Sequence, residues 1–153
     1  MFITNNLLFT IISIPLLGAA FISLFLKQTN LKQIQFFSLV FSFFTFFLSL
    51  LLWFLFENFT FNFQFTEILV WLPNYNINCF FGVDGISLFF ILLVTLLTPI
   101  CILSTFKVIN KNFKEFIILF LIMESFLIIV FSVLDLVIFY IFFESILIPM
   151  FLI

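Results

Sequence analysis

Five long apolar stretches constrain this chain more than any other feature of its sequence. An α-helix needs about 20 apolar residues to cross the hydrocarbon core of a bilayer. Five segments meet or nearly meet that length: residues 7–26, 36–56, 86–106, 116–134 and 136–153. We interpret them as helices, because the strands of a membrane barrel alternate in polarity and these segments do not. The sequence therefore predicts an all-α integral membrane protein with a single transmembrane domain of about five helices.

Composition excludes an ordinary water-soluble domain. Only 8% of the residues are charged and 66% are hydrophobic, whereas a soluble domain carries about 25% charged residues. The surface must therefore contact lipid or partner proteins. The chain has no His, and its two cysteines, Cys79 and Cys101, are far apart in the sequence. We expect no metal, haem or iron–sulfur site in this chain, and we interpret both thiols as unpaired packing groups.

Basic and acidic residues segregate between the connections of the predicted helices. The connections after the first and third helices hold every lysine: Lys27, Lys32, Lys107, Lys111 and Lys114. Four of the five loop carboxylates fall in the other connections: Glu57, Glu67, Asp84 and Asp135. Lysine-rich connections face the cytoplasm-equivalent side of a membrane. The N-terminus is therefore expected on the opposite side.

The long connection of residues 57–83 is predicted to lie at the membrane interface. Its segment NFTFNFQFTEILVW alternates polar and aromatic residues, which predicts a short strand or hairpin. Three aromatic residues are expected to anchor the interface: Trp53, Trp71 and Tyr75. Nothing in this connection indicates catalysis. Asp84 and Asp135 precede predicted helices, where an N-capping role is expected.

Two carboxylates lie well inside the predicted helices. With a rise of 1.5 Å per residue, Glu124 is about 12 Å from the lysine side and Glu144 about 13 Å from the opposite side. In a core about 30 Å thick, both are near the midplane. The fourth and fifth helices are antiparallel neighbours, so we expect both carboxylates to face the same interior. Such acids commonly relay protons, and the alternative is a protonated acid that hydrogen-bonds across a helix interface.

The neighbours of Glu144 favour the relay. Ser125 and Ser145 each place a hydroxyl next to one of the two acids. Pro149 removes a helical hydrogen bond and crowds the carbonyl of Ser145, and freed carbonyls at this depth tend to line polar cavities. No helix breaker lies beside Glu124. The predicted site is therefore a pair of proton-transfer residues, Glu144 and Glu124.

Two stretches resemble a known family. Residues 80–103, FFGVDGISLFFILLVTLLTPICIL, resemble the third helix of subunit 4 of mitochondrial NADH:ubiquinone oxidoreductase (respiratory complex I). Residues 123–153, MESFLIIVFSVLDLVIFYIFFESILIPMFLI, resemble its fourth and fifth helices, with an acid in each helix and a proline five residues after the second acid. Residues 1–79 match only as hydrophobic spans.

The resemblance implies a function and a location. Subunit 4 is an antiporter-like protein of the membrane arm, where quinone reduction elsewhere drives proton transfer along buried charges. The essential glutamate of its fifth helix falls on Glu144, which is expected to pair with a lysine on a later helix, and the fourth-helix glutamate falls on Glu124. The chain is then a multi-pass subunit of the H⁺-translocating reductase in the mitochondrial inner membrane. Its N-terminus would face the intermembrane space.

The resemblance also implies partners. NAD, FMN, iron–sulfur clusters and ubiquinone are expected in partner subunits, with no cofactor and no redox chemistry in this chain. Other membrane-arm subunits and lipids are the expected contacts, with no nucleic acid. Family members continue well beyond a fifth helix. We expect this chain to be the N-terminal product of a split gene whose remainder is a separate chain, the alternative being a fragment of a longer subunit.

Two other functions compete with this interpretation. A subunit of a multi-protein cation/proton antiporter shares ancestry and both glutamates, and it would move protons in response to sodium rather than to a redox reaction. A structural membrane subunit would use Glu124 and Glu144 as packing acids. Replacing Glu144 by Gln would then leave assembly and activity intact.

Overall fold

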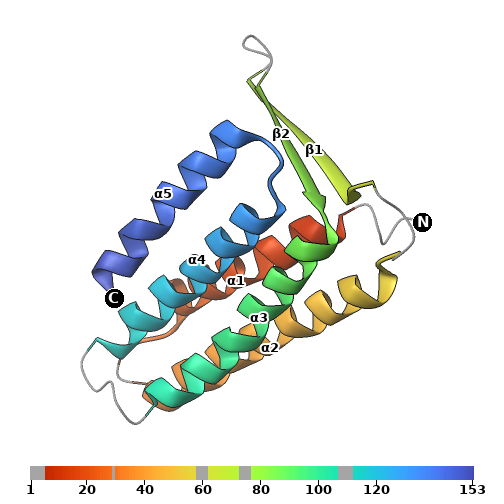
Figure 1. Ribbon diagram of the computed structural model, residues 1–153. Helices are drawn as coiled ribbons and strands as arrows, with labels where there is room; N and C mark the ends of the chain where they lie inside the picture. The colour runs from red at the N-terminus through yellow and green to blue at the C-terminus, as the bar shows by residue number, and fades with distance from the viewer. Residues whose placement is uncertain (1–5, 29, 58–61, 73–76, 107–111) are drawn as a thin grey trace.

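The computed structural model of the chain describes residues 6–28, 30–57, 62–72, 77–106 and 112–153. These residues form five helices and one antiparallel hairpin, and Figure 1 shows how they are arranged. The helices are α1 (Leu7–Phe25), α2 (Leu31–Leu55), α3 (Gly85–Thr105), α4 (Phe113–Ser132) and α5 (Leu136–Leu152), and the strands are β1 (Gln64–Leu72) and β2 (Ile77–Val83). Helices α1 to α4 are long and apolar enough to cross a membrane, and α5 is a shorter apolar helix of 17 residues. The predicted five-helix, all-α membrane architecture is confirmed.

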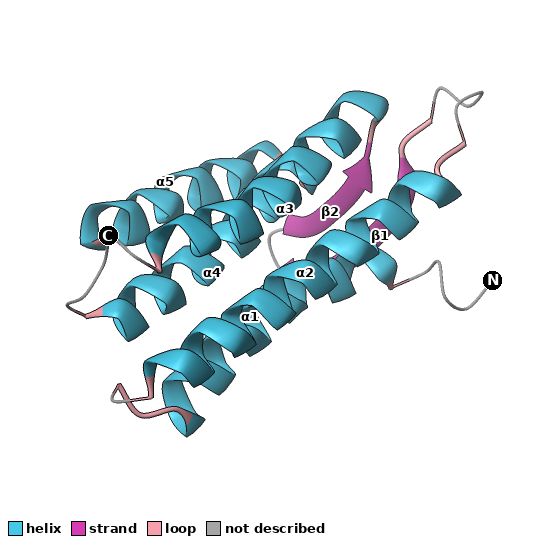
Figure 2. Cartoon of the chain, turned by 90° about the horizontal axis from the view of Figure 1, so that it is seen from below, coloured by secondary structure: helices cyan, strands magenta, loops and turns pink. Residues whose placement is uncertain are grey.

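Helix α4 occupies a central position in the bundle. It packs against α1, α3 and α5, while α2 packs against α1 and α3. Figures 1 and 2 show the helices lying side by side along one direction, with α5 on the outside next to α4. This arrangement surrounds one face of α4 with protein and leaves most of α5 uncovered.

The buried side chains form two apolar clusters separated by polar residues. The cluster beside the hairpin includes Leu8, Ile11, Leu52, Ile91 and Ile128. The cluster at the other end includes Ile22, Ile34, Ile102, Ile117 and Leu121. Along α2, α3 and α4, seven buried polar residues lie between these clusters: Ser42, Thr45, Ser49, Thr95, Thr98, Glu124 and Ser125. We call this set the polar layer, and it crosses the middle of the bundle.

The hairpin predicted within residues 57–83 is confirmed, since β1 pairs antiparallel with β2. It is attached to the bundle at two points. The carbonyl oxygen of Phe80 accepts a hydrogen bond of 2.8 Å from the Leu134 N–H in the α4–α5 connection. The ring of Phe81 packs edge-on against the ring of Phe9 on α1, with 5.4 Å between their centroids. The hairpin therefore covers the end of the bundle where α1 begins.

Both predicted helix caps are confirmed. The Asp84 carboxylate accepts a hydrogen bond of 2.6 Å from the Gly85 N–H, and the Asp84 N–H donates to the Ser87 hydroxyl at 2.7 Å. The Asp135 carboxylate accepts a hydrogen bond of 2.9 Å from the Val137 N–H at the start of α5. These contacts satisfy backbone donors that the first turn of a helix otherwise leaves unpaired.

The described lysines lie at one end of the bundle. Lys27, Lys32 and Lys114 lie at the end opposite the hairpin, where Lys114 Nζ donates a hydrogen bond of 2.8 Å to the carbonyl of Ser23. Lys107 and Lys111 lie outside the described residues. Glu115 lies beside Lys114, and the other four loop carboxylates lie at the hairpin end, so the described lysines are separated from four of the five loop carboxylates as predicted.

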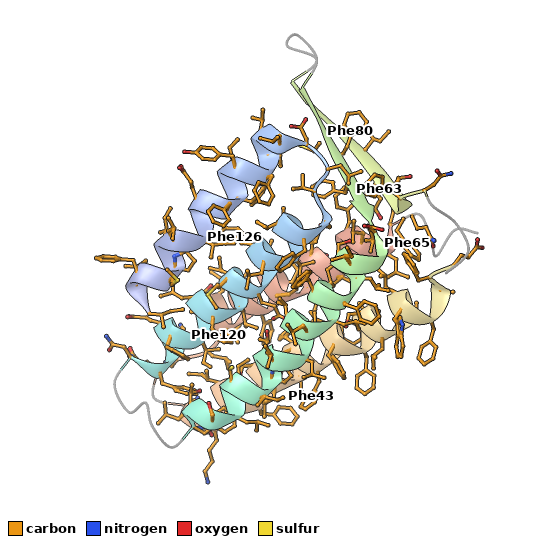
Figure 3. All side chains as sticks on the ribbon, in the orientation of Figure 1. Phe43, Phe63, Phe65, Phe80, Phe120 and Phe126 are labelled. Atoms are coloured by element: carbon orange, nitrogen blue, oxygen red, sulfur yellow. The ribbon has the colours of Figure 1, made fainter. Side chains whose placement is uncertain are left out.

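Aromatic side chains cover much of the outer surface. Figure 3 shows them around the bundle, with Phe43 pointing outward from α2, where it is 43% exposed. Trp53, one of the predicted interface anchors, is 46% exposed near the end of α2. The side chain of Trp71 and all of Tyr75 lie outside the part of the chain that the structure describes. An apolar outer surface of this kind fits a lipid environment.

Candidate functional site

Glu124 is buried in the middle of α4. Its side chain is 1% exposed, and α4 places it against α2. Glu124 Oε1 lies 3.0 Å from Thr45 Oγ1. Within the described residues, Glu124 Oε2 has no hydrogen-bond partner. The carboxyl group thus has a single neutral protein partner inside the polar layer.

The hydroxyl groups of α2 form a stripe that faces this carboxyl group. Ser38, Ser42, Thr45 and Ser49 are separated by four, three and four residues, so they share one face of the helix. All four are fully buried. The spacing alone, within an otherwise apolar span, could have revealed this stripe, and the sequence interpretation missed it. Small hydroxyl residues of this kind let membrane helices approach closely and hydrogen-bond to one another.

A second interhelical contact joins the stripe to α3. Ser49 Oγ and Thr95 Oγ1 are 2.7 Å apart, and either atom can be the donor. Thr95 Oγ1 also lies within hydrogen-bond distance of the carbonyls of Ile91 and Leu92 in its own helix. The polar layer therefore links α2 to α4 through Thr45 and to α3 through Ser49.

Glu144 lies at the centre of α5 but is exposed. Helix α5 contacts α4 through a narrow face on which only Ile138 and Pro149 are buried. Glu144 is one residue before Ser145, so it points about 100° around the helix from the contact stripe that contains Ser145. The expectation that Glu124 and Glu144 face one interior is therefore wrong for the described chain. Glu124 faces into the bundle, and Glu144 faces away from it.

A polar pair marks the outward face of α5. Tyr140 lies one turn before Glu144, so the two side chains are neighbours on this face. Leu147 and Phe151 continue the same stripe and are 51% and 90% exposed. A charged residue at the centre of a lipid-facing helix costs about 3 kcal/mol. An ionised Glu144 on this face would therefore be unfavourable in direct contact with lipid.

The hydroxyl groups of Ser125 and Ser145 bond to their own helices, and Pro149 does not end α5. Ser125 donates a hydrogen bond of 3.1 Å to the Leu121 carbonyl, and Ser145 donates one of 2.7 Å to the Ile141 carbonyl. Each serine hydroxyl is therefore engaged by its own helix rather than by the neighbouring glutamate. Helix α5 continues through Pro149 to Leu152.

A third carboxylate, Glu67, is buried although the sequence interpretation treated it as a loop residue. Its side chain is 5% exposed on β1, opposite Phe81 of β2. Neither of its oxygens has a well-aligned hydrogen-bond partner within the described residues, although the carboxyl group lies close to the backbone of Leu8 and Phe9 at the start of α1. Burial raises the pKa of Glu67 to about 7, and the backbone of Phe9 and Leu8 in the first turn of α1 offsets part of this effect.

The signal for Glu67 was present in the alternating pattern. Thr66 and Ile68 on either side of Glu67 are exposed, and adjacent side chains in a strand point to opposite faces. The acid therefore belongs to the partly buried face of β1, between the exposed Thr66 and Ile68.

The chain is similar in sequence to subunits of NADH-ubiquinone and NADH-quinone oxidoreductases. No protein-family model matches it. It is 52% identical over 143 residues to NADH-ubiquinone oxidoreductase chain 4 of Marchantia polymorpha, which covers 94% of this chain and 29% of the relative. Chain 4 of Arabidopsis thaliana is 50% identical over 139 residues, covering 91% of this chain and 28% of the relative. NADH-quinone oxidoreductase subunit M of Rickettsia typhi is 35% identical over 147 residues, covering 93% of this chain and 30% of the relative.

The chain is a homologue of part of NADH-ubiquinone oxidoreductase chain 4. The resemblance seen in residues 80–103 and 123–153 is therefore confirmed. It also extends beyond those two stretches, since the alignments with chain 4 cover more than nine-tenths of the chain. The chain spans less than a third of the length of the chain 4 relatives that it matches.

Proposed function

We propose that this chain is a membrane-arm component of proton-pumping NADH:ubiquinone oxidoreductase, in which Glu124 and Glu144 transfer protons. The supporting observation is the setting of Glu124, a carboxyl group with 1% exposure and one neutral partner in the polar layer. A permanently ionised carboxylate is costly there without a counter-charge. Proton uptake and release is the usual role of an acid at such a depth.

The outward position of Glu144 defines what it needs from the rest of the assembly. Helix α5 is covered only on its α4 side, and the chain 4 relatives are more than three times as long as the matched region. In our proposal the remaining helices of subunit 4 cover α5 and place a lysine against Glu144. When the lysine approaches, its positive charge favours the ionised carboxylate of Glu144, and when the lysine withdraws, the protonated acid is favoured. Movement of the lysine therefore drives proton release and uptake by Glu144.

Transfer between the two glutamates then requires water. Glu124 and Glu144 face different sides of the α4–α5 pair, which leaves no direct contact for a proton to use. In our proposal, water enters beside α5 in the complete assembly and connects the two groups. The assembly lies in the mitochondrial inner membrane, with the end of the bundle that carries Lys27, Lys32 and Lys114 toward the matrix and the hairpin toward the intermembrane space.

Substitution of Glu144 tests the proton-transfer role. In sealed inner-membrane vesicles oxidising NADH, Glu144→Gln is expected to abolish proton movement per electron while the complex still assembles. Glu115→Gln, which removes an exposed carboxylate at the start of α4, is the matched control and should leave pumping unchanged. Normal pumping by the Glu144→Gln complex would contradict the proposal and favour a packing role. Sodium-dependent proton movement without NADH oxidation would favour an antiporter.

Membership in the assembly has a separate test. Mildly solubilised membranes are separated on a native gel, and the band that contains this chain is analysed by mass spectrometry. Co-migration with a large NADH-oxidising assembly that also contains the later helices of subunit 4 is the expected result. A small band without NADH-oxidising activity would contradict it.

A further inference from the structure

Thr45 contacts two oxygen atoms at once, and its hydroxyl has one proton to offer. Thr45 Oγ1 lies 2.8 Å from the Ser42 carbonyl oxygen and 3.0 Å from Glu124 Oε1. A carbonyl oxygen and an ionised carboxylate oxygen both accept hydrogen bonds and cannot donate them. We infer that Thr45 is a positioning residue for Glu124, whose hydroxyl reorients each time Glu124 gains or loses its proton. This inference rests on the proposed proton-transfer role of Glu124.

The two charge states of Glu124 require different donors. When Glu124 is protonated on Oε1, it donates to Thr45 Oγ1, and the Thr45 hydroxyl donates to the Ser42 carbonyl. When Glu124 is ionised, it can only accept, so the Thr45 hydroxyl turns away from Ser42 and donates to Glu124. The Ser42 carbonyl then keeps only its ordinary helical partner. Thr45 retains its own proton throughout, and the only change at Thr45 is the direction of one hydrogen bond.

This change needs no movement of the helices. A hydroxyl hydrogen rotates about a single bond to suit its partners, and the heavy atoms already lie at hydrogen-bond distance in both arrangements. Thr45 and Glu124 are buried, and Glu124 Oε2 lacks a partner in the described part of the chain. Thr45 is therefore the one protein donor that the described residues provide for an ionised Glu124. No Lys, Arg or His occurs within α1, α3 or α5 to share this task.

Three variants in the assembled complex test the inference. Thr45→Val keeps the size of the side chain and removes the hydroxyl. Because a hydrogen bond to a charged group is lost, the rate of proton pumping is expected to fall by about tenfold. Thr45→Ser restores the hydroxyl and should restore the rate. Thr98→Val is the matched control, since Thr98 is also buried but donates only to the Val94 carbonyl of its own helix.

A spectroscopic measurement separates positioning from packing. The infrared carbonyl band of protonated Glu124 is identified by its loss in Glu124→Gln. This band should shift in Thr45→Val, return in Thr45→Ser and stay unchanged in Thr98→Val. If Thr45→Val does not assemble, Thr45→Ala replaces it in both measurements. A normal pumping rate and an unshifted band in the variant that lacks the hydroxyl would overturn the inference.

Glu124→Gln also separates the two proposals. If Glu124→Gln abolishes pumping while loss of the Thr45 hydroxyl has no effect, the inference about Thr45 fails and the proposed function stands. If Glu124→Gln pumps normally, the role of Glu124 fails and the inference about Thr45 falls with it.

Discussion

Glu67 should make the attachment of the hairpin to the bundle depend on pH. Its carboxyl group is 5% exposed, and burial raises its pKa from 4.5 to about 7. A carboxyl group with a raised pKa stabilises the folded state below its unfolded pKa, and this contribution is lost as pH rises through the folded value. Docking of the hairpin should therefore weaken between about pH 4.5 and about pH 7.

The size of the effect follows from the pKa values. A rise from 4.5 to about 7 corresponds at most to about 3 kcal/mol, because each pKa unit is about 1.4 kcal/mol. Water at the membrane surface screens the charge, which reduces the expected effect to about 1–2 kcal/mol. A difference of this size changes the population of a locally opened hairpin by about 5- to 30-fold.

Hydrogen exchange in the solubilised, assembled complex measures this population. After correction for the intrinsic dependence of exchange on pH, protection of the β1 and β2 amides should fall as pH rises in the native chain. Glu67→Gln should give protection that is nearly independent of pH and higher near pH 8. Glu115→Gln removes an exposed carboxylate at the start of α4, away from the hairpin, and serves as the control. The same pH dependence in Glu67→Gln and in the native chain would refute the reasoning.

Two further substitutions test the packing and capping described above. Gly18→Ala should destabilise the bundle by about 1–3 kcal/mol, because a Cβ atom at Gly18 would lie 2.8 Å from Cγ of Phe41. Gly85→Ala, whose added Cβ meets nothing within 4 Å, is the control, and an equal thermal stability of the two variants would contradict the close α1–α2 approach. Asp84→Ala should cost about 1 kcal/mol and raise hydrogen exchange in the first turn of α3, where Asp84 and Ser87 form the cap. Unchanged exchange there would show that the cap contributes no stability.

The helices and their caps were predictable because simple physical limits fix them. A bilayer sets the length of an apolar span, and the structure has helices over all five predicted segments. Asp84 and Asp135 precede helices whose first backbone N–H groups need a hydrogen-bond acceptor, and both residues cap those helices. The alternation in residues 57–83 predicted a hairpin, and one is present.

The orientation of the glutamates was harder to predict. Helix α5 is apolar on all sides except at Tyr140, Glu144 and Ser145, so its sequence does not indicate which side contacts α4. The position of Glu144 along the helix axis follows from its residue number, whereas the side of the helix that its side chain faces in the bundle depends on how α5 packs. For α2 the information was available, because the spacing of Ser42, Thr45 and Ser49 marks the buried face that meets Glu124.

The number of protons moved per electron in a Glu124→Gln complex tests the central claim most directly. Glu124 is the carboxyl group that this chain itself buries in the middle of the bundle, and Gln keeps its size while removing the ability to carry a proton. Sealed vesicles that oxidise NADH at a measured rate provide both quantities in one experiment. We predict a lower proton-to-electron ratio for Glu124→Gln than for the native complex, with Glu115→Gln unchanged. An unaltered ratio in a fully assembled Glu124→Gln complex would contradict a proton-transfer role for Glu124.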